Sequence, residues 1–62
     1  MAKADITLRG RNYSIACAPG QEARIVALSQ QLDARVKHIA SAVGDIGEDR
    51  LLLITALALL DE

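Results

Sequence analysis

The residues with catalytic chemistry are few, and each of them stands alone in the sequence. His38 is the only histidine and Cys17 the only cysteine of the 62 residues. A catalytic histidine or cysteine needs a base, a nucleophile or a cation within reach, and none is placed beside either residue. The two residues also lack companions at metal-ligand spacing. We therefore expect a protein that is not an enzyme and needs no metal or cofactor, with His38 in solvent and Cys17 in the core.

The basic residues offer a different chemistry, the binding of an acidic partner. Arg9 and Arg11 lie at the expected tip of a hairpin, and exposed tips on a rigid scaffold often carry binding residues. Arg35 and Lys37 are expected on the exposed side of a helix. The alternative interpretation of each is an ordinary solvated surface. The net charge of −1 gives no general attraction to nucleic acid or anionic lipid.

Residues 5–17 are predicted to form an antiparallel β-hairpin. Apolar residues alternate with polar or small ones along this segment, and the large apolar ones are Ile6, Leu8, Tyr13, Ile15 and Cys17. Gly10-Arg11 suits a two-residue type II′ turn, because glycine accepts the positive φ of the first turn position. This turn would pair Leu8 with Tyr13 and place the large apolar side chains on one face. A helix must cover that face, since an isolated hairpin is barely stable in water.

Residues 21–43 are predicted to form a long amphipathic helix after the connector Ala18-Pro19-Gly20. Apolar residues recur at spacings of three and four, as expected for one helical face, and they are Ile25, Leu28, Leu32, Val36, Ile39 and Val43. Gly44 follows the last of them and is a natural residue for ending the helix.

Residues 48–62 are predicted to form the final helix, with Gly47 as its N-cap. Its apolar side chains surround most of the circumference, so the helix needs cover on more than one side. A second copy of the chain would provide that cover, and the candidate interface residues are Leu52, Leu53, Leu57 and Leu60. Because the acidic end has no glycine or cation to stop the helix, we interpret the segment as the start of a truncated dimerisation or coiled-coil helix.

These elements together predict one domain over residues 1–62, of the α+β class, with a β-hairpin followed by two α-helices. A domain of this size buries only about 60% of its unfolded surface, so we expect a homo-oligomer. A lone cysteine suits a reducing compartment. Residues 1–5 contain no apolar signal region, and the apolar run 51–60 is about half of the ~20 residues needed to span a membrane. We therefore expect a cytoplasmic protein without membrane insertion.

Three classes of function fit a small domain of this kind to different degrees. A protein-interaction domain agrees with the apolar final helix and the basic tip. A small dimeric DNA-binding module is the alternative, since short strand-and-helix dimers can enter the major groove. The net charge of −1 argues against nucleic acid as a partner. An enzyme is disfavoured, because no group of polar residues suggests a reactive pocket.

Several segments in order resemble the cell division protein ZapA family. They are residues 6–15 (ITLRGRNYSI), 17–22 (CAPGQE), 28–36 (LSQQLDARV) and 50–62 (RLLLITALALLDE). The first two are similar to the family's strand, Gly-Arg turn, second strand and helix start. The third looks like its first helix, and the last resembles the stretch that opens its long helix. The resemblance covers essentially the whole chain.

The resemblance implies a non-enzymatic regulator of bacterial cell division that acts at midcell. Proteins of this family bind FtsZ and bundle its protofilaments at the Z-ring, and their head domains pair. A C-terminal coiled coil, called the stalk, joins the pairs into tetramers. It is missing here after Glu62, so a tetramer would require the full stalk. The family's turn arginine corresponds to Arg11, and Arg35 matches a basic position of its first helix. Arg9, beside the turn, and Lys37, by its expected exposure, complete the candidate FtsZ-binding residues.

Overall fold

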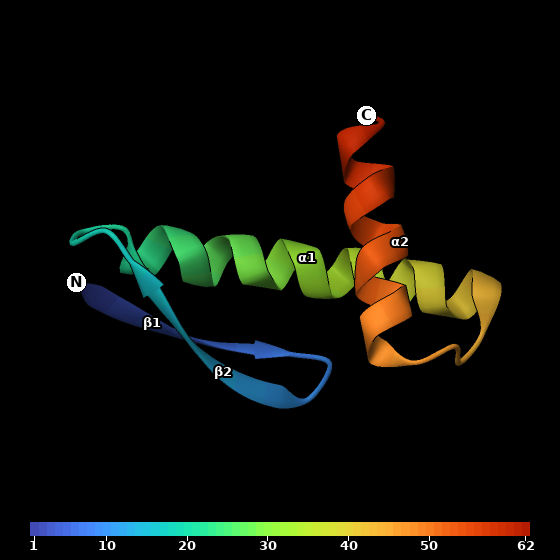
Figure 1. The fold of residues 1–62 in the computed structure, drawn as a ribbon, viewed down its shortest axis with the longest axis horizontal. Helices are drawn as coiled ribbons and strands as arrows, with labels where there is room; N and C mark the ends of the chain where they lie inside the picture. Colours follow the sequence, from blue (N-terminus) through green and yellow to red (C-terminus); the bar gives the residue numbers. More distant parts are fainter.

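The computed structural model describes residues 1–62 and has four elements. In chain order these are β1 (Ala2–Leu8), β2 (Arg11–Cys17), α1 (Glu22–Val43) and α2 (Glu48–Leu60). The strands form a two-stranded antiparallel hairpin that lies along the first half of α1, and α2 stands steeply across the second half (Figure 1). The predicted α+β class and the order of its elements are confirmed. None of the helices is both long enough and apolar enough to cross a membrane.

The hairpin turn differs from the one expected. Leu8 pairs with Arg11, so the turn residues are Arg9 and Gly10, and the predicted turn at Gly10-Arg11 is wrong. Both turn residues have positive φ, 54° for Arg9 and 80° for Gly10, as a type I′ turn requires. Tyr13 consequently faces Ile6 instead of Leu8. The shift is an even number of residues, so every side chain keeps the face that the alternation predicted.

Only one strand of the hairpin is well covered by α1. Ala4, Ile6 and Leu8 of β1 are buried, and α1 packs against this strand. On β2, Tyr13 and Ile15 point to the same face but remain 41% and 39% exposed. The single helix is too narrow to cover both strands, so the apolar face of β2 is left half-open.

The packing of α1 against α2 contains the most completely buried side chains of the molecule. These are Val36 from α1 and Leu51 and Thr55 from α2. The Thr55 hydroxyl donates a hydrogen bond of 2.7 Å to the carbonyl of Leu51, which satisfies this polar group inside the core. The sequence pattern did not predict a threonine in the core, because only apolar residues were assigned to it.

The predicted apolar stripe of α1 is present but only partly covered. Val36 is fully buried, whereas Leu28 and Val43 are 43% and 47% exposed. Ser29, which was not among the expected core residues, is buried and donates its hydroxyl to the carbonyl of Val26. Its small side chain lies on the helix face that packs against β1. The single chain therefore buries the centre of the stripe and leaves its flank open.

Candidate functional site

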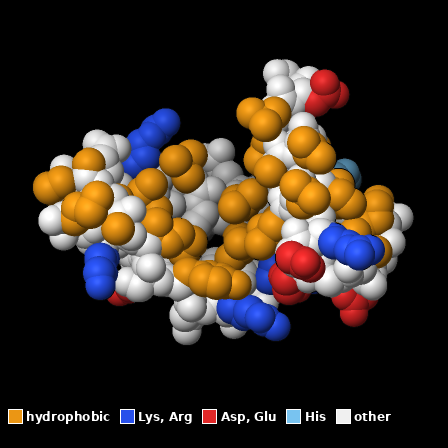
Figure 2. All heavy atoms as spheres, viewed as in Figure 1, with side chains coloured by type: hydrophobic (Ala, Val, Ile, Leu, Met, Phe, Trp, Pro, Cys, Tyr) orange, Lys and Arg blue, Asp and Glu red, His pale blue; other side chains and the backbone are white.

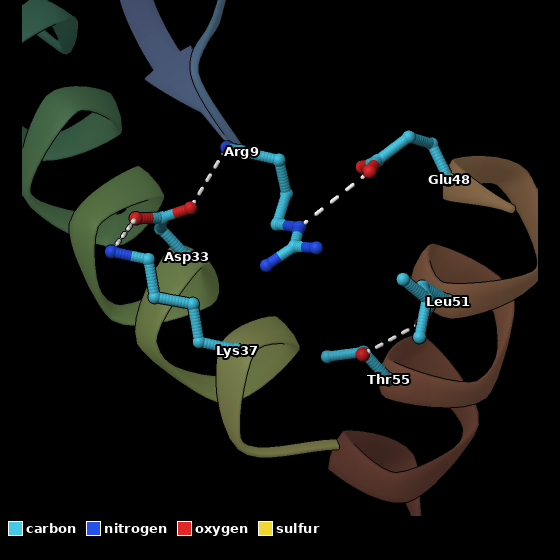
Figure 3. A network of polar contacts seen from close by, with 6 residues as sticks. All are labelled: Arg9, Asp33, Lys37, Glu48, Leu51 and Thr55. Carbon is cyan, nitrogen blue, oxygen red and sulfur yellow. Dashed lines mark hydrogen bonds and ion pairs between the residues drawn. The ribbon is translucent and has the colours of Figure 1, made fainter. Parts of the chain in front are cut away.

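Arg9 lies at the hairpin tip, but its side chain turns back toward the helices instead of into solvent. Its backbone N–H donates a hydrogen bond of 2.8 Å to Oδ1 of Asp33 on α1. Its guanidinium Nε lies 3.6 Å from Oε1 of Glu48, the first residue of α2 (Figure 3). The Arg9 side chain is 28% exposed, and the Nε atom is buried without a hydrogen-bond acceptor. The expectation of a freely exposed Arg9 is therefore wrong.

Asp33 interacts with two basic residues near the hairpin tip. Its other oxygen, Oδ2, lies 3.4 Å from Nζ of Lys37, one helical turn further along α1. The hydrogen bond from the Arg9 backbone lowers the pKa of Asp33, Lys37 lowers it further, and partial burial opposes both. The carboxylate consequently stays charged to lower pH than usual. We call Arg9, Asp33, Lys37 and Glu48 the tip corner.

Arg11 is the only one of the four candidate basic residues that has no carboxylate partner in the chain. It begins β2, is exposed, and takes part in none of the chain's ion pairs. Because it pairs with Leu8 directly across the turn, its backbone direction is set by the geometry of Arg9 and Gly10. It thus presents a free guanidinium from a fixed position.

Arg35 lies apart from the tip corner. It forms a two-pronged ion pair with Glu62, in which Nη1 meets Oε2 and Nη2 lies 3.1 Å from Oε1. Hydrogen bonding to Arg35 lowers the pKa of Glu62 below its usual value. Arg35 also lines a hollow of about 300 Å³ between the helices, together with Leu28, Gln31, Leu32 and Leu59. The structure therefore joins Arg9 and Lys37 through Asp33, but it does not bring Arg11 and Arg35 together.

The outer face of α2 is apolar and uncovered. Leu53, Leu57 and Leu60 are 60%, 59% and 84% exposed, and their spacing of four and three residues aligns them on one helical face. We call these three residues the outer stripe. Leu52, also a predicted interface residue, is half-buried and lies between the outer stripe and the buried side of α2. The other three predicted interface residues are thus the accessible ones.

A second apolar surface joins the hairpin to α2. A hollow of about 170 Å³ lies between the hairpin and α1, lined mainly by Ile6, Ile15, Ile25, Leu28 and Leu32. It shares Leu28 and Leu32 with the hollow beside Leu59, so the two are adjacent. Figure 2 shows apolar side chains over the hairpin, across the middle of this view and along α2. Exposed apolar surface of this extent marks protein interaction sites.

Sequence reasoning did not find Asp33 and Glu48 as members of a site. The spacing of Asp33 and Lys37 is a usual signal for an ion pair on one helix. No local signal connects Arg9 with Glu48, because they come from different elements and meet only after folding. His38 is exposed and Cys17 is buried, and no group of three metal-ligating side chains occurs in the chain.

These features define a small α+β interaction domain. Its hairpin tip is held by contacts of Arg9 with both helices and carries one unpaired arginine, and its last helix has one uncovered apolar face. The family model for cell division protein ZapA matches residues 4–62. The chain therefore belongs to the ZapA family. This is a family of cell division proteins associated with FtsZ and the Z-ring, in which oligomers and coiled coils occur, and it is not a family of enzymes. No curated protein and no solved structure matches the chain significantly.

Proposed function

We propose that this chain binds FtsZ directly and promotes the association of its protofilaments at the Z-ring, in the cytoplasm at midcell. The observation that carries the proposal is the free Arg11 at a braced tip in a protein of the ZapA family. An unpaired guanidinium can form a bidentate contact with a carboxylate at little desolvation cost, which suits an acidic partner surface.

The other basic candidates differ from Arg11 because each already has a carboxylate partner in the chain. They are Arg9, Arg35 and Lys37. A contact with FtsZ would have to compete with these pairs, so each contributes less than Arg11. Lys37 is the most accessible of the three, with a side chain that is 64% exposed. We assign Arg11 the main contact and the other three supporting contacts.

Self-association would convert binding into bundling. The outer stripe and the two adjacent hollows are apolar surfaces that the chain does not cover itself. A second copy covering them would form a homodimer with two tips, and a full stalk would extend this to a tetramer. Two tips on one rigid body bind a repetitive polymer with an avidity far above that of a single site.

Co-sedimentation with GTP-assembled FtsZ, with light scattering on the same samples, tests the proposal. We expect the chain to pellet with FtsZ, and Arg11→Glu to reduce pelleting roughly tenfold by replacing attraction with repulsion. Arg24→Glu is the matched control, because Arg24 is also exposed and unpaired but lies at the start of α1.

The outcomes separate binding from bundling. Pelleting with strong extra scattering would mean that the chain itself cross-links protofilaments, whereas pelleting without it would limit this chain to binding. A folded chain that does not pellet would contradict direct binding. Equal losses for Arg11→Glu and Arg24→Glu would contradict a site at the hairpin tip. Nothing in the comparisons supports the DNA-binding alternative, and a duplex-DNA mobility shift at physiological salt tests it independently.

A further inference from the structure

Arg9 is the one hairpin residue that contacts both helices through polar groups. Its backbone N–H is bonded to Asp33 of α1, and its guanidinium is paired with Glu48 of α2. No other hydrogen bond or ion pair in the chain joins the hairpin to α2. The tip therefore has a single polar connection to the helix that carries the outer stripe.

Arg9 is also the only non-glycine residue with a positive φ, 54°. An L-residue with a side chain rarely adopts this conformation, because its Cβ approaches the backbone too closely. The hydrogen bond from its N–H to a charged carboxylate offsets that cost, since bonds to charged acceptors are stronger than those between neutral groups. The turn thus keeps its shape through a contact made by tertiary folding.

We infer that Arg9, Asp33 and Glu48 are positioning residues for the contact made by Arg11, and that the packing of α2 controls this contact through the Arg9–Glu48 pair. Asp33 holds the turn, and the turn sets the direction in which Arg11 leaves β2. Glu48 makes the same turn sensitive to where α2 begins. Any change in α2, including its coverage by a second copy, is thereby transmitted to the tip. This inference rests on the proposed binding of FtsZ.

The position of Glu48 suits this role. It is the first residue of α2, directly after Gly47, whose φ of 100° makes the chain change direction at that point. A displacement of α2 therefore moves the Glu48 carboxylate together with the helix. The Arg9 Nε is buried without a hydrogen-bond acceptor, and its only ion-pair partner is Glu48, 3.6 Å away, so no other carboxylate replaces Glu48 when it moves away. The pair acts as a link between α2 and the tip.

Hydrogen exchange of the protein alone tests the structural half of the inference. We expect Asp33→Ala to accelerate exchange of the Arg9 amide about tenfold or more, because the amide loses its acceptor. Glu48→Gln should accelerate exchange in the turn, while amides in the middle of α1 keep their protection. Asp49→Asn is the matched control, since it removes the same charge from the same helical turn without touching Arg9. Equal effects of Glu48→Gln and Asp49→Asn would overturn the link.

FtsZ co-sedimentation tests the functional half, with Arg11 intact in every variant. Glu48→Gln should weaken binding about fivefold or more, the lower range of coupling between linked sites, and Asp49→Asn should not. Arg9→Glu and Glu48→Arg should each weaken binding, and the double exchange should restore most of it by reforming the pair with reversed polarity. A double exchange that binds as poorly as Arg9→Glu would overturn the inference, because Arg9 would then act through its own supporting contact with FtsZ and not through its pair with Glu48.

The wild-type chain separates failure of this inference from failure of the proposed function. Wild-type pelleting with no difference between Glu48→Gln and Asp49→Asn would refute the link and leave FtsZ binding in place. A folded wild-type chain that does not pellet would refute the proposed function, and with it the control of binding by α2. The exchange measurement would then decide whether the link between the tip and α2 exists in the fold.

Discussion

The tip corner and the outer stripe differ in whether the chain itself supplies their partners. At the tip corner, charged groups from the hairpin, α1 and α2 find partners inside one chain. On α2, the outer stripe remains between 59% and 84% exposed. A polar group is satisfied by one or two correctly placed atoms, whereas an apolar face must be covered over its whole area. A chain of 62 residues can provide the first but not the second.

The same contrast divides α2 itself into two sides. Leu51 and Thr55 are 1% and 0% exposed and belong to the core, while the outer stripe lies on the opposite side. If the division is correct, substitutions on the two sides should affect different quantities. The buried side should control the stability of one chain, and the outer stripe should control association between chains.

Replacing a leucine on the buried side should have the largest effect on stability. Leu51→Ala leaves a cavity beside Val36 and Thr55 and should lower the free energy of unfolding by about 3 kcal/mol. Leu53→Ala, at a site that is 60% exposed, should change it by less than about 0.5 kcal/mol at low protein concentration. Urea titration measures both. Equal destabilisation by the two variants would break the division of α2 into two sides.

Introducing a charge into the outer stripe should disrupt self-association. Leu57→Asp places an unpaired carboxylate in the proposed interface, and association should weaken by about 2 kcal/mol or more. Analytical ultracentrifugation measures the effect as a shift toward monomer, or as aggregation. Leu57→Met is the control, because it keeps apolar volume at the same position. A dimer that tolerates Leu57→Asp would remove the outer stripe from the interface.

Acid should weaken the tip corner. The pKa of Asp33 is lowered from its usual 3.8, so the folded chain binds fewer protons than the unfolded chain, and stability rises with pH in this range. The contribution of Asp33 is therefore complete above about pH 4 and is lost as the pH falls through the lower pKa of the folded state. Asp33→Asn should flatten the loss of stability below pH 4. Asp5→Asn, at an exposed site with no ion pair, is the control for removing one carboxylate from the hairpin. Identical profiles for wild type and Asp33→Asn would contradict the assignment.

The smallest effect is expected from the hydroxyl of Thr55. Thr55→Val removes its hydrogen bond to the Leu51 carbonyl but preserves the shape of the side chain. We expect a change of about 1 kcal/mol or less, because the hydroxyl and its acceptor lie in one helix and bond only locally. Urea titration alongside Leu51→Ala provides the scale. A loss as large as that of Leu51→Ala would show that the hydroxyl itself is essential to the buried side.

The sequence was informative about the fold wherever periodicity was strong. Alternation in residues 5–17 predicted the hairpin and the face of each side chain, and spacings of three and four predicted the first helix. The turn was wrong by one residue because glycine was assigned the first turn position. The observed turn needs a positive φ at Arg9, and its hydrogen bond to Asp33, 24 residues away, accompanies that conformation.

The site was less predictable than the fold. Exposure of Arg11, Arg35 and Lys37 could be predicted from their places in the pattern. The inward direction of Arg9 could not, because its partner Glu48 belongs to another element. The burial of Ser29 and Thr55 was also not predicted, because polar residues were not expected in the core. Their hydroxyls bond to the carbonyls of the helices that carry them, so these polar residues enter the core at little cost.

By itself the sequence determined which elements form, in which order and with which apolar faces, because hydrophobic spacing acts within each segment. It also carried the resemblance to the ZapA family. Only the tertiary structure decided which apolar residues are covered and which remain open, because a single helix covers β1 but not β2. It likewise decided that Arg9 braces the tip while Arg11 stays free, since charges distant in sequence become partners only when the elements pack.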